Sequence, residues 1–107
     1  MNIISNHNLH CKIALDALQQ VIDPEIGLNV VDLGLIYQID FDEEQKKIFV
    51  LMTMTTQFCP MGESIADAVT RAIEHVFPAH AVQVEVTFNP HWNNTMISED
   101  GKFFLNK

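Results

Sequence analysis

The sequence predicts an α/β fold, a two-layer sandwich in which two helices cover one face of a small three-stranded mixed sheet. Two segments repeat apolar residues at helical spacing, three alternate apolar with polar residues, and their order is α-β-β-α-β. A strand–helix–strand step is a right-handed crossover, so the second and third strands are expected to be parallel if they are neighbours. The 107 residues fit one domain, 1–107, with its own core.

Both predicted helices carry an apolar stripe. The first is expected over 9–22, and Asp23-Pro24 ends it because a residue before proline disfavours the helical conformation. The second is expected over 60–77, where Pro60 suits the first helical position. Its stripe follows an i, i+4, i+7, i+8, i+11 pattern and consists of Ile65, Val69, Ala72, Ile73 and Val76.

The three predicted strands cover 35–41, 47–55 and 82–88, with a polar hairpin loop between the first two. Alternation in the first strand places four apolar side chains on one face, namely Leu35, Tyr37, Ile39 and Phe41. Residues 1–7 are expected to be a loose lead. The tail over 90–107 has no period, but its apolar side chains are expected to pack back on the domain.

Composition excludes several kinds of partner. Fourteen acidic residues against six basic ones give a net charge of −8, which argues against nucleic acid because phosphate binding needs Lys and Arg. No apolar run approaches the roughly 18 residues of a membrane span. The N-terminus lacks the features of a signal peptide, and two cysteines are few for a disulfide scaffold. We therefore expect a cytoplasmic protein with free thiols and no membrane partner.

The single most informative residue is Cys59, which lies between the second predicted strand and the second helix. A thiolate there would meet unpaired backbone N–H groups and the positive end of the helix dipole, so Cys59 is a candidate nucleophile or soft-metal ligand. Two facts favour the plain alternative of a buried small residue: free cysteine is often buried, and Glu63 and Asp67 in the same helix disfavour a negative charge.

Three carboxylates, Asp23, Glu25 and Asp32, frame an otherwise apolar connection, so the fold must hydrate, pair or metallate them. The simpler reading is that they accept loop amide hydrogen bonds. Trp92 is either a packing anchor or part of a partner-binding surface.

Histidines supply weaker signals. His7, His10 and Cys11 belong either to an ordinary N-terminal segment or to a metal-binding cluster. His75, His80 and His91 are expected at the surface.

Taken together, these features resemble the SufT/PaaD-like family of iron–sulfur cluster assembly proteins. The resemblance rests on residues 23–37, which read DPEIGLNVVDLGLIY, on the Thr55-Thr56-x-x-Cys59-Pro60 element, and on Pro90-x-Trp92 with the later segment 96–102. These motifs occur in the family's order over roughly residues 10–105. Gln57 and Phe58 stand where members usually have Pro-Gly.

The resemblance implies a role in maturing iron–sulfur proteins, with the functional thiol at Cys59 and supporting positions at Asp23, Glu25, Asp32, Thr55 and Thr56. It implies iron or a labile cluster as cargo, with Cys59 as a ligand, and assembly proteins and client apoproteins as partners. A cubane cluster commonly uses four thiolates and the chain has two, so a second copy (a homodimer), client cysteines or carboxylates would complete the site. Whether Cys11 takes part is left open.

Two other functions remain. The chain could be a metal-free adaptor that recruits clients through its apolar tail around Trp92, or a thiol enzyme, for which the sequence supplies no evident general base. We therefore expect an assembly or carrier factor rather than an enzyme.

Overall fold

A computed structural model describes residues 3–24, 26–55 and 62–105 of the chain. Four strands form one mixed sheet in the order β1-β2-β3-β4, with β1 parallel to β2, β2 antiparallel to β3 and β3 parallel to β4. The elements are β1 (Ile4–Ser5), α1 (Asn8–Leu18), β2 (Ile36–Asp42), β3 (Lys47–Met52), α2 (Gly62–Val76), β4 (Ala81–Val86), the 3-10 turn η1 (Asn94–Met96) and α3 (Glu99–Leu105).

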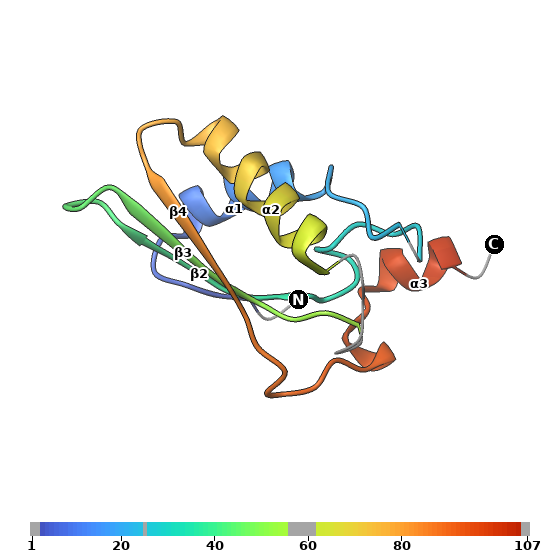
Figure 1. Cartoon of the computed structure of the whole chain (residues 1–107). Helices are drawn as coiled ribbons and strands as arrows, with labels where there is room; N and C mark the ends of the chain where they lie inside the picture. Colours follow the sequence, from blue (N-terminus) through green and yellow to red (C-terminus); the bar gives the residue numbers. More distant parts are fainter. Residues whose placement is uncertain (1–2, 25, 56–61, 106–107) are drawn as a thin grey trace.

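Both long helices, α1 and α2, lie on the same side of the sheet, and no described helix covers the other side (Figure 1). The buried residues of the helices meet those of the strands in one core, to which Ala14, Leu18, Val69 and Ile73 contribute from the helices and Ile39, Ile48, Val50 and Met52 from the strands. The predicted parallel relationship across the β3–α2–β4 step is confirmed. No helix within the described residues is long and apolar enough to cross a membrane.

Strand β1 was not predicted, because two residues offer no alternation to read. Ile4 and Ser5 pair with β2, so the expected loose lead over 1–7 does not hold for these positions. The next residue extends the pairing with its side chain: Asn6 Nδ2 donates to the carbonyl of Phe41 at 2.8 Å, and the Phe41 N–H donates to Asn6 Oδ1 at 2.9 Å. An asparagine amide thereby takes the place of one more strand residue.

The register of β2 differs from the simple alternation that the sequence predicts. A bulge between Ile36 and Gln38 shifts the pairing, so Ile36 is buried with 3% exposure and Tyr37 is only half-buried. Beyond the bulge the predicted alternation holds, and Ile39 and Phe41 face the core. A bulge places one extra residue on one strand and re-aims the side chain at that point.

Helix α1 ends earlier than the proline signal predicts. Its last residue is Leu18, and the chain after it turns so that Ile22 forms an isolated β-bridge with Asn29. This bridge closes the connection between α1 and β2 into a compact loop. Competition from this tertiary pairing explains the early end of the helix.

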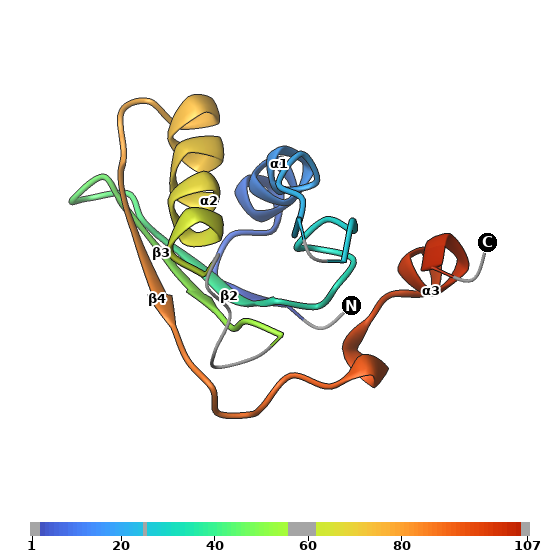
Figure 2. The same cartoon turned by 45° about the vertical axis from the view of Figure 1, so that its right-hand side comes forward.

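The tail runs from β4 past the end of the sheet, and α3 lies beside the α1–β2 connection, away from α2 (Figure 2). Gly34, with φ +80°, permits this approach because a Cβ there would overlap the carbonyl of Met96. At Gly101 a Cβ would lie 2.8 Å from an Ile97 side-chain carbon and 2.9 Å from one of Leu28. Two glycines thus bring the tail and the connection into backbone contact.

Candidate functional site

The Asp23 turn is the best-defined part of the predicted site. Asp23 is 1% exposed, its N–H donates to the carbonyl of Leu28 at 3.0 Å, and its own carbonyl accepts from the Gly27 N–H at 2.7 Å. Gly27 has φ +83°, a conformation that favours glycine. The result is a tight turn that holds a carboxyl-bearing residue inside the molecule.

This turn lies beside α2. Pro24 and Ile22 line a groove of about 500 Å³ together with Ser64 and Ile65 of the helix. The structure therefore places the two neighbours of Asp23, Ile22 and Pro24, against the side of α2.

Three predicted site residues, Glu25, Thr56 and the functional thiol Cys59, lie outside the described residues. Their neighbour Thr55 is half-buried in the extension that follows β3. The preceding Thr53 is fully buried, and its N–H donates to the carbonyl of Leu35 at 2.8 Å, which fixes the direction of that extension.

Asp32 is engaged with the tail rather than with α2. Its Oδ2 accepts from Asn29 Nδ2 at 2.7 Å and its Oδ1 accepts from Ser98 Oγ at 2.8 Å. The Ser98 oxygen also accepts from the N–H of Gly101 at 3.0 Å, which makes Ser98 the cap of α3. In the structure, Asp32 therefore holds the start of α3 through Ser98.

Trp92 anchors the tail to the same connection. Its indole Nε1–H donates to the carbonyl of Leu33 at 2.6 Å, and the half-buried ring packs against the core. A little further along the sheet, the Tyr37 hydroxyl donates to the carbonyl of Pro90 at 2.8 Å. Burial raises the pKa of Tyr37 above 10.0, with a smaller opposing effect from a hydrogen bond with Thr53. The phenol therefore stays protonated and remains a donor.

The structure reveals a histidine cluster that the sequence analysis did not find. Glu43 lies 3.0 Å from His10 Nδ1, 3.3 Å from His80 Nε2 and 3.7 Å from Lys46 Nζ. His7 has a different role, since its Nδ1 caps α1 by accepting from the His10 N–H at 3.1 Å. His10 and His80 lie far apart in the sequence, so their spacing gives no indication that both contact Glu43.

Metal-ligand geometry does not occur in the part of the chain that the structure describes. Over 3–24, 26–55 and 62–105, no three His, Cys, Asp or Glu side chains are arranged to hold an ion. Cys11 is 7% exposed and belongs to the core cluster. It is therefore a packing residue in this conformation.

The tail also ends on an apolar surface. Phe103, Phe104 and Leu105 of α3 are 72%, 48% and 41% exposed. Large exposed apolar side chains in sequence are a usual mark of an interaction surface.

Comparisons with known proteins agree with the resemblance found in the sequence. A family model described as iron–sulfur cluster assembly protein matches residues 13–86. The Bacillus subtilis Fe-S protein maturation auxiliary factor YitW is 35% identical over 85% of this chain and 88% of its own length. The Staphylococcus aureus factor named SufT is 36% identical over 79% of this chain and 96% of its own. A solved structure from Bacillus anthracis, titled as a domain of unknown function, has a TM-score of 0.86 at 32% identity and covers 92% of this chain and 93% of its own.

Proposed function

Because the chain belongs to the family of iron–sulfur cluster assembly proteins, we propose that it is an accessory factor in iron–sulfur protein maturation that delivers iron or a labile cluster to client apoproteins through Cys59. In this proposal the chain is a carrier or assembly factor and not an enzyme. Its partners are the assembly machinery and the client apoproteins. The match of nearly full-length relatives named maturation auxiliary factors carries the proposal.

The position of Cys59 in the sequence supports its role. Helix α2 begins at Gly62, three residues after the cysteine. The unpaired N–H groups and dipole at a helix start favour an anion nearby, and the thiolate is the form that binds iron. Asp23 is buried, and its neighbours Ile22 and Pro24 line a groove with α2, so we assign Asp23 a positioning role for the turn that packs on this helix. The same supporting role is proposed for Glu25, Thr55 and Thr56.

Asp32 takes part less directly in this proposal. Its carboxylate holds Ser98 and thereby the tail, so its effect on cluster transfer runs through the α1–β2 connection. Loss of Asp32 is therefore expected to weaken client activation less than loss of Cys59.

Ligand counting explains why the cluster would be labile. A cubane cluster commonly uses four thiolates, and the chain has two cysteines. Cys11 is 7% exposed in the core, so it would have to leave the interior to bind a cluster. We therefore propose that Cys59 supplies one thiolate and that a client or a second copy supplies the others. Such incomplete coordination suits a cargo that must be released.

The test is anaerobic loading followed by transfer. The purified full chain is reconstituted with ferrous iron and sulfide, its iron content and visible spectrum are recorded, and activation of an apo-[4Fe–4S] hydratase is measured. Cys59→Ser is expected to lose activation, and Cys11→Ala, checked for folding by circular dichroism, is expected to retain it. Wild-type chain that neither binds iron nor speeds activation would refute the carrier role, as would a Cys59→Ser variant as active as the wild type.

The exposed apolar end of α3 favours one second function, a metal-free adaptor. Phe103 at 72% exposure and Phe104 at 48% offer a surface for client recruitment that does not involve the thiol. Trp92 would then support this surface as the anchor of the tail. The pair Phe103→Ser and Cys59→Ser separates the two functions. If the chain is an adaptor, Phe103→Ser loses client capture and Cys59→Ser keeps it. If the chain is a thiol carrier, Cys59→Ser loses client activation and Phe103→Ser keeps it.

A further inference from the structure

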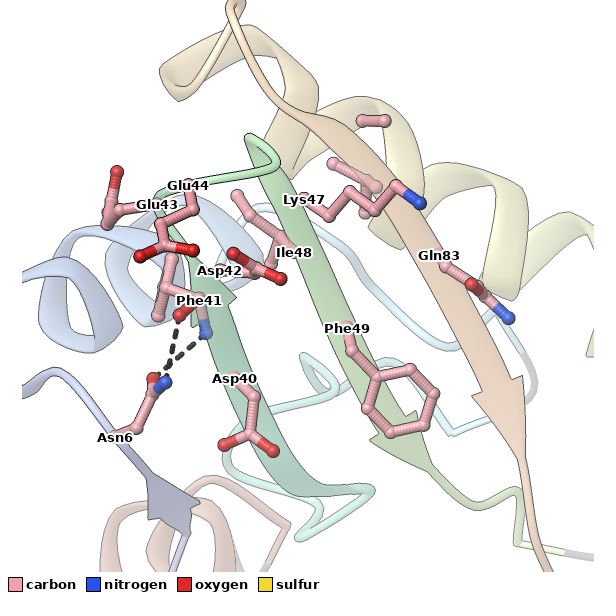
Figure 3. A pocket seen from close by; sticks show the side chains of 12 residues that line it. Asn6, Asp40, Phe41, Asp42, Glu43, Glu44, Lys47, Ile48, Phe49 and Gln83 are labelled. Atoms are coloured by element: carbon pink, nitrogen blue, oxygen red, sulfur yellow. Dashed lines mark hydrogen bonds between the residues drawn. The ribbon is translucent and has the colours of Figure 1, made fainter.

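The open face of the sheet carries a groove of about 880 Å³ at its hairpin end. It runs across β2, β3 and β4, from Asn6 at one side to Gln83 at the other, and the helices lie behind the strands (Figure 3). The groove uses none of the residues proposed for cluster transfer. It is therefore a separate surface.

Three chemically different side chains stand in one row across this groove. Strand register pairs Asp40 with Phe49, and Phe49 with Gln83. Neighbouring strands are about 4.8 Å apart, so the half-buried ring of Phe49 lies between a carboxylate and an amide on the same face. Figure 3 shows these three side chains on the side away from the helices.

The groove is strongly acidic. Four carboxylates line it, on Asp40, Asp42, Glu43 and Glu44, against one ammonium group, on Lys47. Of the four, Glu43 alone has ion-pair partners within the described part of the chain. Gln38 donates to one oxygen of Asp40, Oδ2, and this hydrogen bond orients the carboxylate beside Phe49.

We propose that this groove binds an arginine-bearing extended segment of a partner protein. A planar guanidinium can stack on the Phe49 ring while its N–H groups donate to the Asp40 carboxylate, and the Gln83 amide oxygen lies on the other side of the ring. The remaining carboxylates attract the rest of a basic segment. A second copy of this chain is a poor occupant, because each copy carries a net charge of −8.

Peptide titration of the ¹⁵N-labelled full chain tests the proposal. The probe is a capped seven-residue peptide with arginine at two alternating positions among serine and glycine, compared with its lysine and alanine versions. The arginine peptide is expected to shift the backbone amides of Asp40, Phe49 and Gln83. It should bind at least about threefold more tightly than the lysine version, which lacks the planar fork. The alanine version should not bind.

Three variants make the outcome specific. Asp40→Asn is expected to weaken binding about tenfold because it removes a charge-assisted contact, and Phe49→Leu should abolish the preference for arginine over lysine. Asp16→Asn, on the exposed side of α1, is the matched control and should bind as the wild type does. Equal losses in Asp40→Asn and Asp16→Asn would mean attraction by net charge only and would overturn the proposal. So would shifts that map away from the groove. Neither result bears on iron loading, so the two proposals fail separately.

Discussion

The hydroxyl of Ser98 lies 2.8 Å from a carboxylate oxygen of Asp32, although the two residues are 66 positions apart in the chain. This hydrogen bond joins the α1–β2 connection to the tail, and the same Ser98 oxygen caps α3. One side chain therefore serves both the local start of a helix and its tertiary attachment.

Replacing Ser98 should detach the tail helix. Ser98→Ala removes the cap and the bond to Asp32, and each such loss costs roughly 1 kcal/mol, so a decrease of about 1–2 kcal/mol in unfolding free energy is expected. Urea unfolding measures the total. Hydrogen exchange at the amides of Phe103 and Phe104 should quicken more than exchange in β3. Ser64→Ala, at an exposed position of α2, is the matched control and should change neither reading.

The glycines of the connection provide a second, paired test. Gly27 and Gly34 both have positive φ, but a Cβ on Gly27 would meet nothing within 4 Å, whereas one on Gly34 would overlap the Met96 backbone. Gly27→Ala should cost about 1 kcal/mol for the backbone conformation alone. Gly34→Ala should cost about 1–3 kcal/mol more, because the tail must move to relieve the overlap. If Gly27→Ala and Gly34→Ala lower the stability equally in thermal unfolding, the tail moves away from Gly34 at no cost in free energy.

The indole of Trp92 gives a third prediction. Trp92→Phe keeps an aromatic ring but leaves the Leu33 carbonyl without its donor, at a cost of about 1–3 kcal/mol if water does not replace it. Chemical unfolding followed by far-UV circular dichroism measures the change. His91→Ala, one residue earlier and exposed, should leave stability unchanged. A Trp92→Phe variant as stable as the wild type would show that the hydrogen bond is dispensable.

Glu43 makes stability depend on pH. The pKa of its carboxyl lies below 4.5, first because His80 donates a hydrogen bond to it. Desolvation raises the pKa and is the second-largest effect, and the charges of His80, His10 and Lys46 each lower the pKa by a smaller amount. Since the folded pKa is the lower one, the stability that Glu43 contributes is present above about pH 4.5 and is lost as pH falls through the folded value.

Glu43→Gln tests this dependence directly. The variant should be less stable than the wild type at about pH 6, and the difference should shrink as pH falls through the lowered pKa of Glu43 and the wild-type carboxylate becomes protonated. Glu44→Gln, at the next position, which is also exposed, is the control and should show a difference that does not vary with pH. A Glu43→Gln difference that persists at the acid end would contradict the assignment.

Much of the fold could be predicted because its signals are local. The stripe from Ile65 to Ile73 has one helical period, and the alternation from Val82 to Val86 has one strand period, so helix α2 and strand β4 were expected close to where they occur. What could not be predicted depends on partners far away in the chain. Ile4 and Ser5 form β1 only because β2 is beside them. The bulge between Ile36 and Gln38 shifts the pairing of β2 with β3, and simple alternation of apolar residues does not predict this shift.

The candidate site divides in the same way. Motif order led to Asp23 and Asp32. In the structure the neighbours of Asp23 line a groove with α2, whereas Asp32 accepts a hydrogen bond from Ser98, a contact between distant residues that spacing cannot reveal. The assignment of the thiol to Cys59 stays a prediction. The cluster of His10 and His80 on Glu43 joins three segments. The sequence analysis placed His10 in the N-terminal lead and His80 at the surface, whereas the side chain of His80 is only 10% exposed.

The Asn6 amide has a consequence for how such a sheet can grow. With its two bonds to Phe41, it occupies the border of β2 just beyond the two residues of β1, so among the described residues that side offers only a short strand edge. Strand β4 is the border at the opposite end of the sheet order. Two molecules that joined through their β4 edges would therefore close on each other as a pair, because the described part of the opposite border gives further copies little strand to pair with.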